Sequence, residues 1–136
     1  MQFLQNSDLG KLILRIACGG ILLFHGVFKV THGIPDVMEL TAKAGLPPFL
    51  AYGTYLGEFI APILILIGYQ TRIAGLIVAL NMLLSILIAH SDIMFSVNDY
   101  GGWMIETNML YMLSALALAF TGAGKYSLSK GKAPFD

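Results

Sequence analysis

The chain has 136 residues, of which 57% are hydrophobic and only 12% charged, and its formal net charge is zero. Soluble domains carry roughly 25% charged residues, so this composition is typical of one small domain surrounded largely by lipid. A neutral chain with no basic run and one cysteine, Cys18, excludes nucleic acid as a partner, an internal disulfide and a thiolate zinc site.

Four windows of mainly apolar residues follow one another along the chain, each close to the roughly 20 residues that cross a bilayer as a helix. We therefore predict an all-α integral membrane four-helix bundle with antiparallel up-down topology, forming one domain over residues 1–136. The first window is not followed by a small-residue cleavage site, so we expect it to be retained rather than removed as a signal peptide. The predicted helices cover residues 9–30, 49–68, 72–90 and 103–121.

The connections between these windows carry residues that begin or end helices. Apolar residues recur at roughly helical spacing within residues 31–46 and predict a short amphipathic helix at the interface. Pro47 and Pro48 then separate this segment from the second window. Gly68 is placed as a C-cap and Thr71 as an N-cap of a tight turn. Such a short turn makes the second and third helices antiparallel neighbours.

Lysine and arginine are unevenly divided between the two sides of this topology. Five of them fall on the side shared by both termini and the second loop, and two on the opposite side. Positive residues in short loops mark the cytoplasmic side, so we expect both termini in the cytoplasm. The five are Lys11, Arg72, Lys125, Lys130 and Lys132, and the two are Lys29 and Lys43.

Polar residues of the first predicted helix share one face. At 100° per residue, His25 and Lys29 lie within about 80° of Arg15. Gly19 and Gly26 lie beside this stripe, where a missing side chain lets a neighbouring helix come close. A charge at the bilayer centre costs about 2.5 to 3.5 kcal/mol on insertion scales. This face is therefore expected to point into the bundle.

Glu58 is the only acid of the second predicted helix and lies near its middle. With a rise of 1.5 Å per residue, Arg15 falls within about 6 Å of it in height. We predict an Arg15–Glu58 ion pair, because removing either partner would leave an unpaired buried charge. A purely structural role of this pair, in folding and insertion, is an open alternative.

The remaining ionisable residues gather toward the outer half of the predicted bundle, within about two turns of its boundary, and could line a polar pocket. An imidazole facing the interior beside two cations is an unusual choice for packing alone, which singles out His25. The candidate catalytic residues are His25 and Glu58, and the candidate ligand-binding residues are Arg15, Lys29, His90, Glu106, Asn108 and Tyr111.

Several of these residues also have a simpler structural explanation. Lys29 can extend its ammonium group to the lipid headgroups, and His90 can be an exposed helix cap. Asn81 and Ser85 are typical of hydrogen bonds between membrane helices. We predict no metal site, since the methionines fit ordinary core filling better than a path for a soft metal.

The sequence resembles the DoxX family of small bacterial membrane proteins over nearly its whole length. The third predicted helix ends in His90, as in the family, and the other matching segments are LRIACGGILLFHGVFK (14–29), GLPPFLAYGTYLGEFIAPILILIGYQTRIAGL (45–76) and TGAGKYSL (121–128). The resemblance implies four membrane helices, a place in the bacterial inner membrane and a link to redox systems, because the family takes its name from a subunit of a thiosulfate:quinone oxidoreductase.

The resemblance also implies which polar positions recur. The fourth helix of the family usually carries a YN-type motif, which Thr107 and Asn108 occupy here. Its first position departs from the family, and this leaves the role of Glu106 open. The recurring polar positions correspond to Arg15, His25, Lys29, Glu58 and His90.

We expect a redox-associated subunit that binds a quinone or another small molecule in an outward-facing pocket. His25, Lys29 or Arg15 would donate to the carbonyl oxygens, and His25 and Glu58 would relay protons. Electrons would come from a partner oxidoreductase, soluble or membrane-bound, so activity of this chain alone is left open.

Other functions compete with this one. The main alternative is a non-enzymatic membrane anchor, or a module that handles small molecules or metals. A weaker one places a haem between His25 and His90. Paired glycines permit a homo-oligomer without selecting one.

Overall fold

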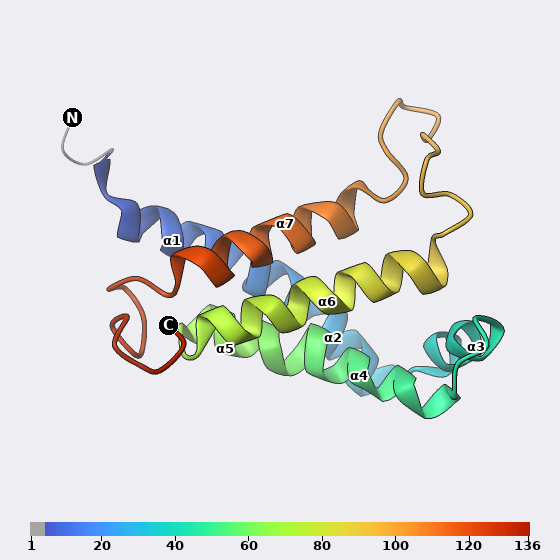
Figure 1. The fold of residues 1–136 in the computed structure, drawn as a ribbon, viewed down its shortest axis with the longest axis horizontal. Helices are drawn as coiled ribbons and strands as arrows, with labels where there is room; N and C mark the ends of the chain where they lie inside the picture. The colour runs from blue at the N-terminus through green and yellow to red at the C-terminus, as the bar shows by residue number, and fades with distance from the viewer. Residues whose placement is uncertain (1–4) are drawn as a thin grey trace.

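A computed structural model describes residues 5–136 of the chain. Within that range the regular structure is helical, and the only pairing of extended residues is an isolated bridge between Val97 and Trp103. The all-α prediction is confirmed. The first residue of α1 and the last residue of the chain, Asp136, lie at the same end of the molecule (Figure 1).

The first long helix runs from Ser7 to His32 and contains a π-helical turn. It comprises α1 (Ser7–Arg15), the π segment η2 (Ile16–Gly20) and α2 (Ile21–His32). The side chain of Asn6 caps its start by accepting a hydrogen bond from the Leu9 amide at 3.1 Å. The helix therefore extends two residues beyond the predicted range at each end.

The predicted amphipathic segment forms α3 (Pro35–Lys43), which lies to one side of the main helices (Figure 1). Its proline stands in the first turn, where the missing amide costs nothing. A lone exposed ion pair joins Glu39 and Lys43 on this helix at 2.6 Å. The short-helix prediction for this segment is confirmed.

The second long helix, Pro48–Ile67, changes its hydrogen-bonding pattern along its length. It ends at Gly68, whose left-handed backbone (φ 72°) makes it the predicted C-cap. The successive segments are the 3-10 turn η3 (Pro48–Tyr52), α4 (Gly53–Tyr55), the π segment η4 (Leu56–Ile60) and α5 (Ala61–Ile67).

The third long helix, α6 (Thr71–Ala89), begins differently from the prediction. Thr71 is its first helical residue rather than its N-cap, and the Thr71 amide donates to Asp136 Oδ1 at 2.9 Å. A carboxylate is favourable there, because amides and the helix dipole make a helix N-terminus positive. The N-cap predicted at Thr71 is wrong because a residue of the distant C-terminal segment supplies the acceptor.

The last helix, α7 (Glu106–Thr121), packs along α6 (Figure 1). It starts three residues later than predicted, since Trp103 is held in the preceding turn. The Trp103 indole donates to the Met94 carbonyl at 2.6 Å, and Trp103 pairs with Val97.

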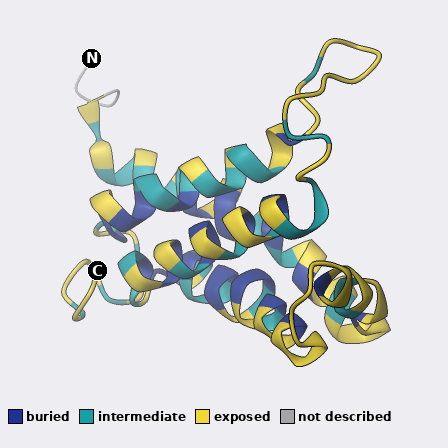
Figure 2. Cartoon of the chain, turned by 45° about the vertical axis from the view of Figure 1, so that its right-hand side comes forward, coloured by how far each residue is buried: buried dark blue, intermediate teal, exposed yellow. Residues whose placement is uncertain are grey.

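In the described part of the chain, three helices are long and apolar enough to cross a membrane: Ser7–His32, Pro48–Ile67 and Thr71–Ala89. Their buried residues lie on the sides that face one another, and exposed residues lie on the outer sides (Figure 2). Many of the exposed residues are large and apolar. Phe24, for example, is 78% exposed. Apolar side chains on the outside and small ones inside are what a lipid environment favours.

The first two long helices approach each other through glycine, as the sequence predicted. A Cβ atom added at Gly19 would lie 2.7 Å from the Pro62 carbonyl oxygen, and one at Gly26 would overlap the Glu58 carbonyl oxygen. No side chain fits at either position. This contact brings the backbone around Glu58 directly against α2.

Candidate functional site

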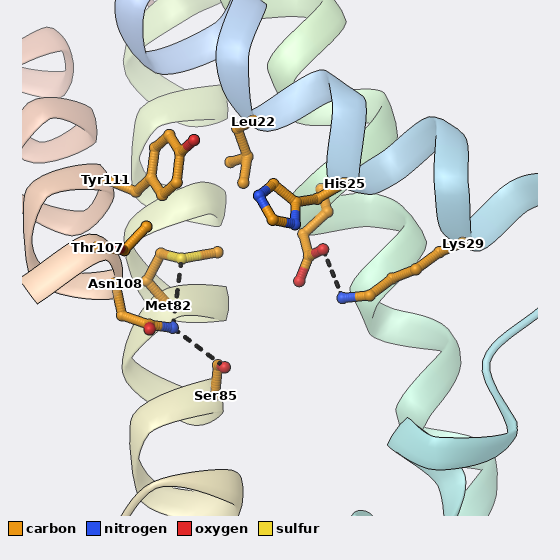
Figure 3. A pocket seen from close by; sticks show the side chains of 9 residues that line it. Leu22, His25, Lys29, Met82, Ser85, Thr107, Asn108 and Tyr111 are labelled. Atoms are coloured by element: carbon orange, nitrogen blue, oxygen red, sulfur yellow. Dashed lines mark hydrogen bonds and ion pairs between the residues drawn. The ribbon is translucent and has the colours of Figure 1, made fainter. Parts of the chain in front are cut away.

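A cavity of about 160 Å³ lies between α2, the π segment η4, α6 and α7. It opens because α7 packs on the first long helix mainly through α1 and η2, which leaves α2 apart from α7 beyond that point. Figure 3 shows the lining side chains converging from these elements. They are Leu22, His25, Lys29, Glu58, Met82, Ser85, Thr107, Asn108 and Tyr111.

Glu58 is the centre of a buried polar network on one wall of this cavity. Its Oε2 lies 2.5 Å from Lys29 Nζ, and its Oε1 accepts hydrogen bonds from Thr54 Oγ1 at 3.1 Å and Asn81 Nδ2 at 3.2 Å. Lys29 also donates to Thr54 Oγ1 at 3.2 Å. Both carboxylate oxygens therefore have donors, as a charge that is only 6% exposed requires.

His25 and Tyr111 occupy opposite sides of the cavity. Their rings meet edge to face with centroids 6.4 Å apart (Figure 3). Among residues 5–136, no hydrogen bond is formed by the His25 ring or by the Tyr111 hydroxyl. Asn108 completes this side by donating to Ser85 Oγ at 3.3 Å. An imidazole and a phenol are thus free to bind a polar ligand in the cavity beside them.

Arg15 does not pair with Glu58, so that prediction is wrong. Arg15 is 2% exposed, and within residues 5–136 its guanidinium donates only to backbone carbonyls. Nε donates to Ile65 at 2.8 Å and NH2 to Leu66 at 2.8 Å, both in the last turn of α5. NH1 donates to Ala123 at 3.2 Å and Tyr126 at 2.7 Å, beyond the end of α7. Arg15 therefore supplies a donor to the Leu66 carbonyl, which the end of α5 leaves without an intrahelical one, and joins α5 to the segment after α7.

Two features of the helices explain the error. The π segment η2 separates Arg15 from His25, and a π turn holds one residue more than an α turn. It rotates the following face by about 100° relative to a uniform α-helix, so Arg15 and His25 do not continue one stripe. In addition, α1 extends past the end of α5 (Figure 1). Heights in the membrane that were counted from the predicted helix ends therefore placed Arg15 too close to Glu58. The cation that pairs with Glu58 is Lys29.

Two other predicted site residues lie outside the cavity. The His90 ring is within hydrogen-bond distance of the Ser85 carbonyl, 3.1 Å from Nδ1, and His90 is the C-cap of α6. Glu106 is exposed in the first turn of α7. His90 is therefore not among the residues that line the cavity with His25. In residues 5–136 there is no cluster of three His, Cys, Asp or Glu side chains suited to a metal ion.

Sequence reasoning missed three residues as part of the site: Ser85 lines the cavity, and Thr54 and Asn81 hydrogen-bond to Glu58 in its wall. Thr54 was not singled out, although it precedes Glu58 by four residues and so lies on the same helix face. Asn81 and Ser85 were assigned only to contacts between helices, and both do make such hydrogen bonds. Five predicted residues line the cavity together: His25, Lys29, Glu58, Asn108 and Tyr111.

Comparison with known proteins matches the sequence model of the DoxX family to residues 10–91. The chain is 31% identical over 119 residues to "Putative oxidoreductase CatD" of Bacillus subtilis (strain 168), covering 88% of this chain and 84% of the relative. It is also 31% identical over 124 residues to "Inner membrane protein YqjF" of Escherichia coli (strain K12), covering 91% and 92% respectively. No solved structure matches the chain.

Proposed function

The chain belongs to the DoxX family of bacterial membrane proteins, and from this premise we propose that it is a redox-associated subunit that binds a quinone head group beside Glu58. The supporting observation is the pair formed by His25 and Tyr111, whose polar groups line one cavity without partners in residues 5–136. A relative named as an oxidoreductase agrees with a redox role.

The size of the cavity limits what enters it. Pockets that enclose a drug-sized ligand occupy roughly 300 to 1,000 Å³, whereas this one holds about 160 Å³. A single ring with its carbonyl oxygens is therefore the suitable occupant. An isoprenoid tail would remain in the lipid outside.

The proposed chemistry is proton supply to a bound quinone. His25 donates a hydrogen bond to one carbonyl oxygen and the Tyr111 hydroxyl to another. Reduction to the hydroquinone takes two electrons from a partner oxidoreductase and two protons, one for each oxygen. His25 is an exposed residue of the cavity wall and passes these protons inward. The Lys29–Glu58 pair fixes the cavity wall and keeps its charge balanced.

The membrane arrangement that we propose has α7 as a fourth span and both termini in the cytoplasm of a bacterium. At 1.5 Å per residue the 16 residues of α7 cover about 24 Å, less than the roughly 30 Å of hydrocarbon. Its exposed apolar residues, among them Leu110 and Phe120, support contact with lipid, and local thinning of the bilayer accommodates the difference.

Quinone content of protein purified from membranes tests the proposal. His25→Ala and Tyr111→Phe should each lower the quinone that organic solvent extracts, by roughly tenfold for His25→Ala, because a donor to the ligand is lost. His32→Ala is the matched control, since His32 belongs to the same helix but stacks on Phe28 away from the cavity.

Equal quinone content in the His25→Ala variant and in wild type would contradict the proposal. Co-purification of a soluble protein without quinone, unaffected by His25→Ala, would instead favour the membrane-anchor function. Thermal unfolding of each variant confirms that the fold is retained.

A further inference from the structure

A second cavity, of about 300 Å³, lies near the other end of α7, away from the His25 site. We propose that it binds a phosphate group. Four cationic and two acidic side chains line it, so positive charge exceeds negative. The cations are Lys11, Arg72, Lys125 and Lys130, and the acids are Asp8 and Asp136.

The C-terminal segment closes this cavity by folding back onto α1. The Lys125 amide donates to Asp8 Oδ1 at 3.2 Å. Gly124 adopts a left-handed conformation (φ 74°), and a Cβ atom added there would lie 3.0 Å from both Asp8 Oδ1 and Lys11 Cδ. The segment is thus held against α1 in a form that favours glycine. The shape of the cavity is therefore set by the backbone of this segment and does not depend on the positions of its lysine side chains.

Both acidic side chains already have donors. Asp8 accepts from the Lys125 amide and lies 3.6 Å from Lys11 Nζ, and Asp136 Oδ1 accepts from the Thr71 amide. By contrast, Lys125 and Lys130 form no salt bridge with any acid in residues 5–136, and both are exposed. The Lys125 ammonium lies over the Tyr126 ring, 5.0 Å from its centroid, a contact that brings no negative charge. Both ammonium groups can therefore bind an added anion, and lysine is a common binder of phosphate.

Arg72 lines the cavity and is held in place by backbone oxygens. Its guanidinium donates to Ala119 O at 2.9 Å, Phe120 O at 2.6 Å and Asp136 O at 2.8 Å. Three main-chain oxygens thus hold its positive charge in place. This contribution is electrostatic and does not need Arg72 to move.

The buried Oδ2 of Asp136 has no donor in the part of the chain that the structure describes. A ligand that carries hydroxyl groups beside its phosphate would supply one. The cavity also lies where the long helices begin and end, at Ser7 and Thr121, which is the level of lipid headgroups if the helices cross the bilayer. A phosphate group reaches it either as an anionic phospholipid headgroup or as free phosphate.

Binding of two probes to detergent-purified full-length protein tests this inference. The probes are dihexanoyl phosphatidylglycerol and inorganic phosphate, titrated at constant ionic strength with native mass spectrometry and thermal shift as readouts. We expect Lys125→Ala/Lys130→Ala to weaken binding of the effective probe by about tenfold, because two charge-assisted contacts are lost. Saturation by phosphatidylglycerol alone identifies a lipid site, and saturation by both identifies a general phosphate site.

The matched control is Lys43→Ala/Lys132→Ala, which removes the same charge from residues that do not line the cavity. An equal loss in both double variants would show that only overall charge matters and would overturn the proposal. Failure of both probes to bind would also overturn it. Unfolding without a probe should be unchanged in both variants, since the substituted lysines are exposed. His25→Ala should not affect this binding.

Discussion

The Lys29–Glu58 ion pair differs from the Lys43–Glu39 pair in burial far more than in distance. The two pairs measure 2.5 and 2.6 Å, but the carboxylate side chain is 8% exposed in the first and 64% in the second. On the surface the hydrogen bond and charge of Lys43 lower the pKa of Glu39, yet such exposed pairs contribute little to stability. Inside the bundle, a Glu58 carboxylate without its lysine would destabilise the fold, because a buried charge would be left unpaired.

Replacing Lys29 by methionine should lower the free energy of unfolding by about 2–3 kcal/mol, because Glu58 would keep a buried charge without its cation. Glu58→Gln should cost less, since Lys29 is 23% exposed and can turn toward water. Reversible unfolding in mixed detergent measures both. Lys43→Met, the control in the exposed pair, should change the free energy by less than about 0.5 kcal/mol, and an equal loss in Lys43→Met and Lys29→Met would refute the role of burial.

The helices owe their packing to glycine positions and to two π-helical turns. Gly19 and Gly26 allow close approach, and their role follows from the helical repeat, which is why the sequence predicted it. The π segments η2 and η4 were not predictable, because a one-residue insertion leaves no mark on composition or hydropathy. For the same reason the sequence identified Glu58 as a buried acid that needs a cation but assigned the wrong one.

Gly26→Ala should lower the free energy of unfolding by about 2 kcal/mol, since its Cβ would overlap the Glu58 carbonyl and force the two helices apart. Gly20→Ala is the control in the same helix, because a Cβ there would make an ordinary contact 3.6 Å from Leu66. It should leave stability unchanged or raise it by up to ~1 kcal/mol. The close-contact interpretation fails if both variants unfold alike.

In the whole molecule, the C-terminal segment connects the ends of several helices. Its Leu128 amide donates to Ile67 O at 2.9 Å, and Arg15 donates to the carbonyls of Ala123 and Tyr126. None of these contacts was predicted, because they join residues more than 50 positions apart and involve backbone atoms that every residue carries. The sequence predicted that the Arg15 side chain points into the bundle and needs polar partners. It contained no signal that these partners are backbone carbonyls.

Arg15→Lys should release this segment while leaving the helices formed. A single ammonium group cannot reach the four carbonyls that the guanidinium now satisfies. Hydrogen exchange of the amides of Leu128 and Ser129 should accelerate by at least about tenfold, since opening becomes easier. Lys132→Ala is the control and should leave exchange unchanged. Protection that stays equal in Arg15→Lys would show that the segment is held without the guanidinium.

The partners of Arg15 also set an order on biosynthesis. This cation enters the bilayer with the first helix. The first of its acceptors along the chain, Ile65, is synthesised 50 residues later, and Ala123 follows 108 residues after Arg15. Until then the nascent chain carries a positive group that lipid disfavours. We therefore expect Arg15 to be fully buried only after the segment beyond the last helix has been made, so that the fold is completed at once rather than helix by helix.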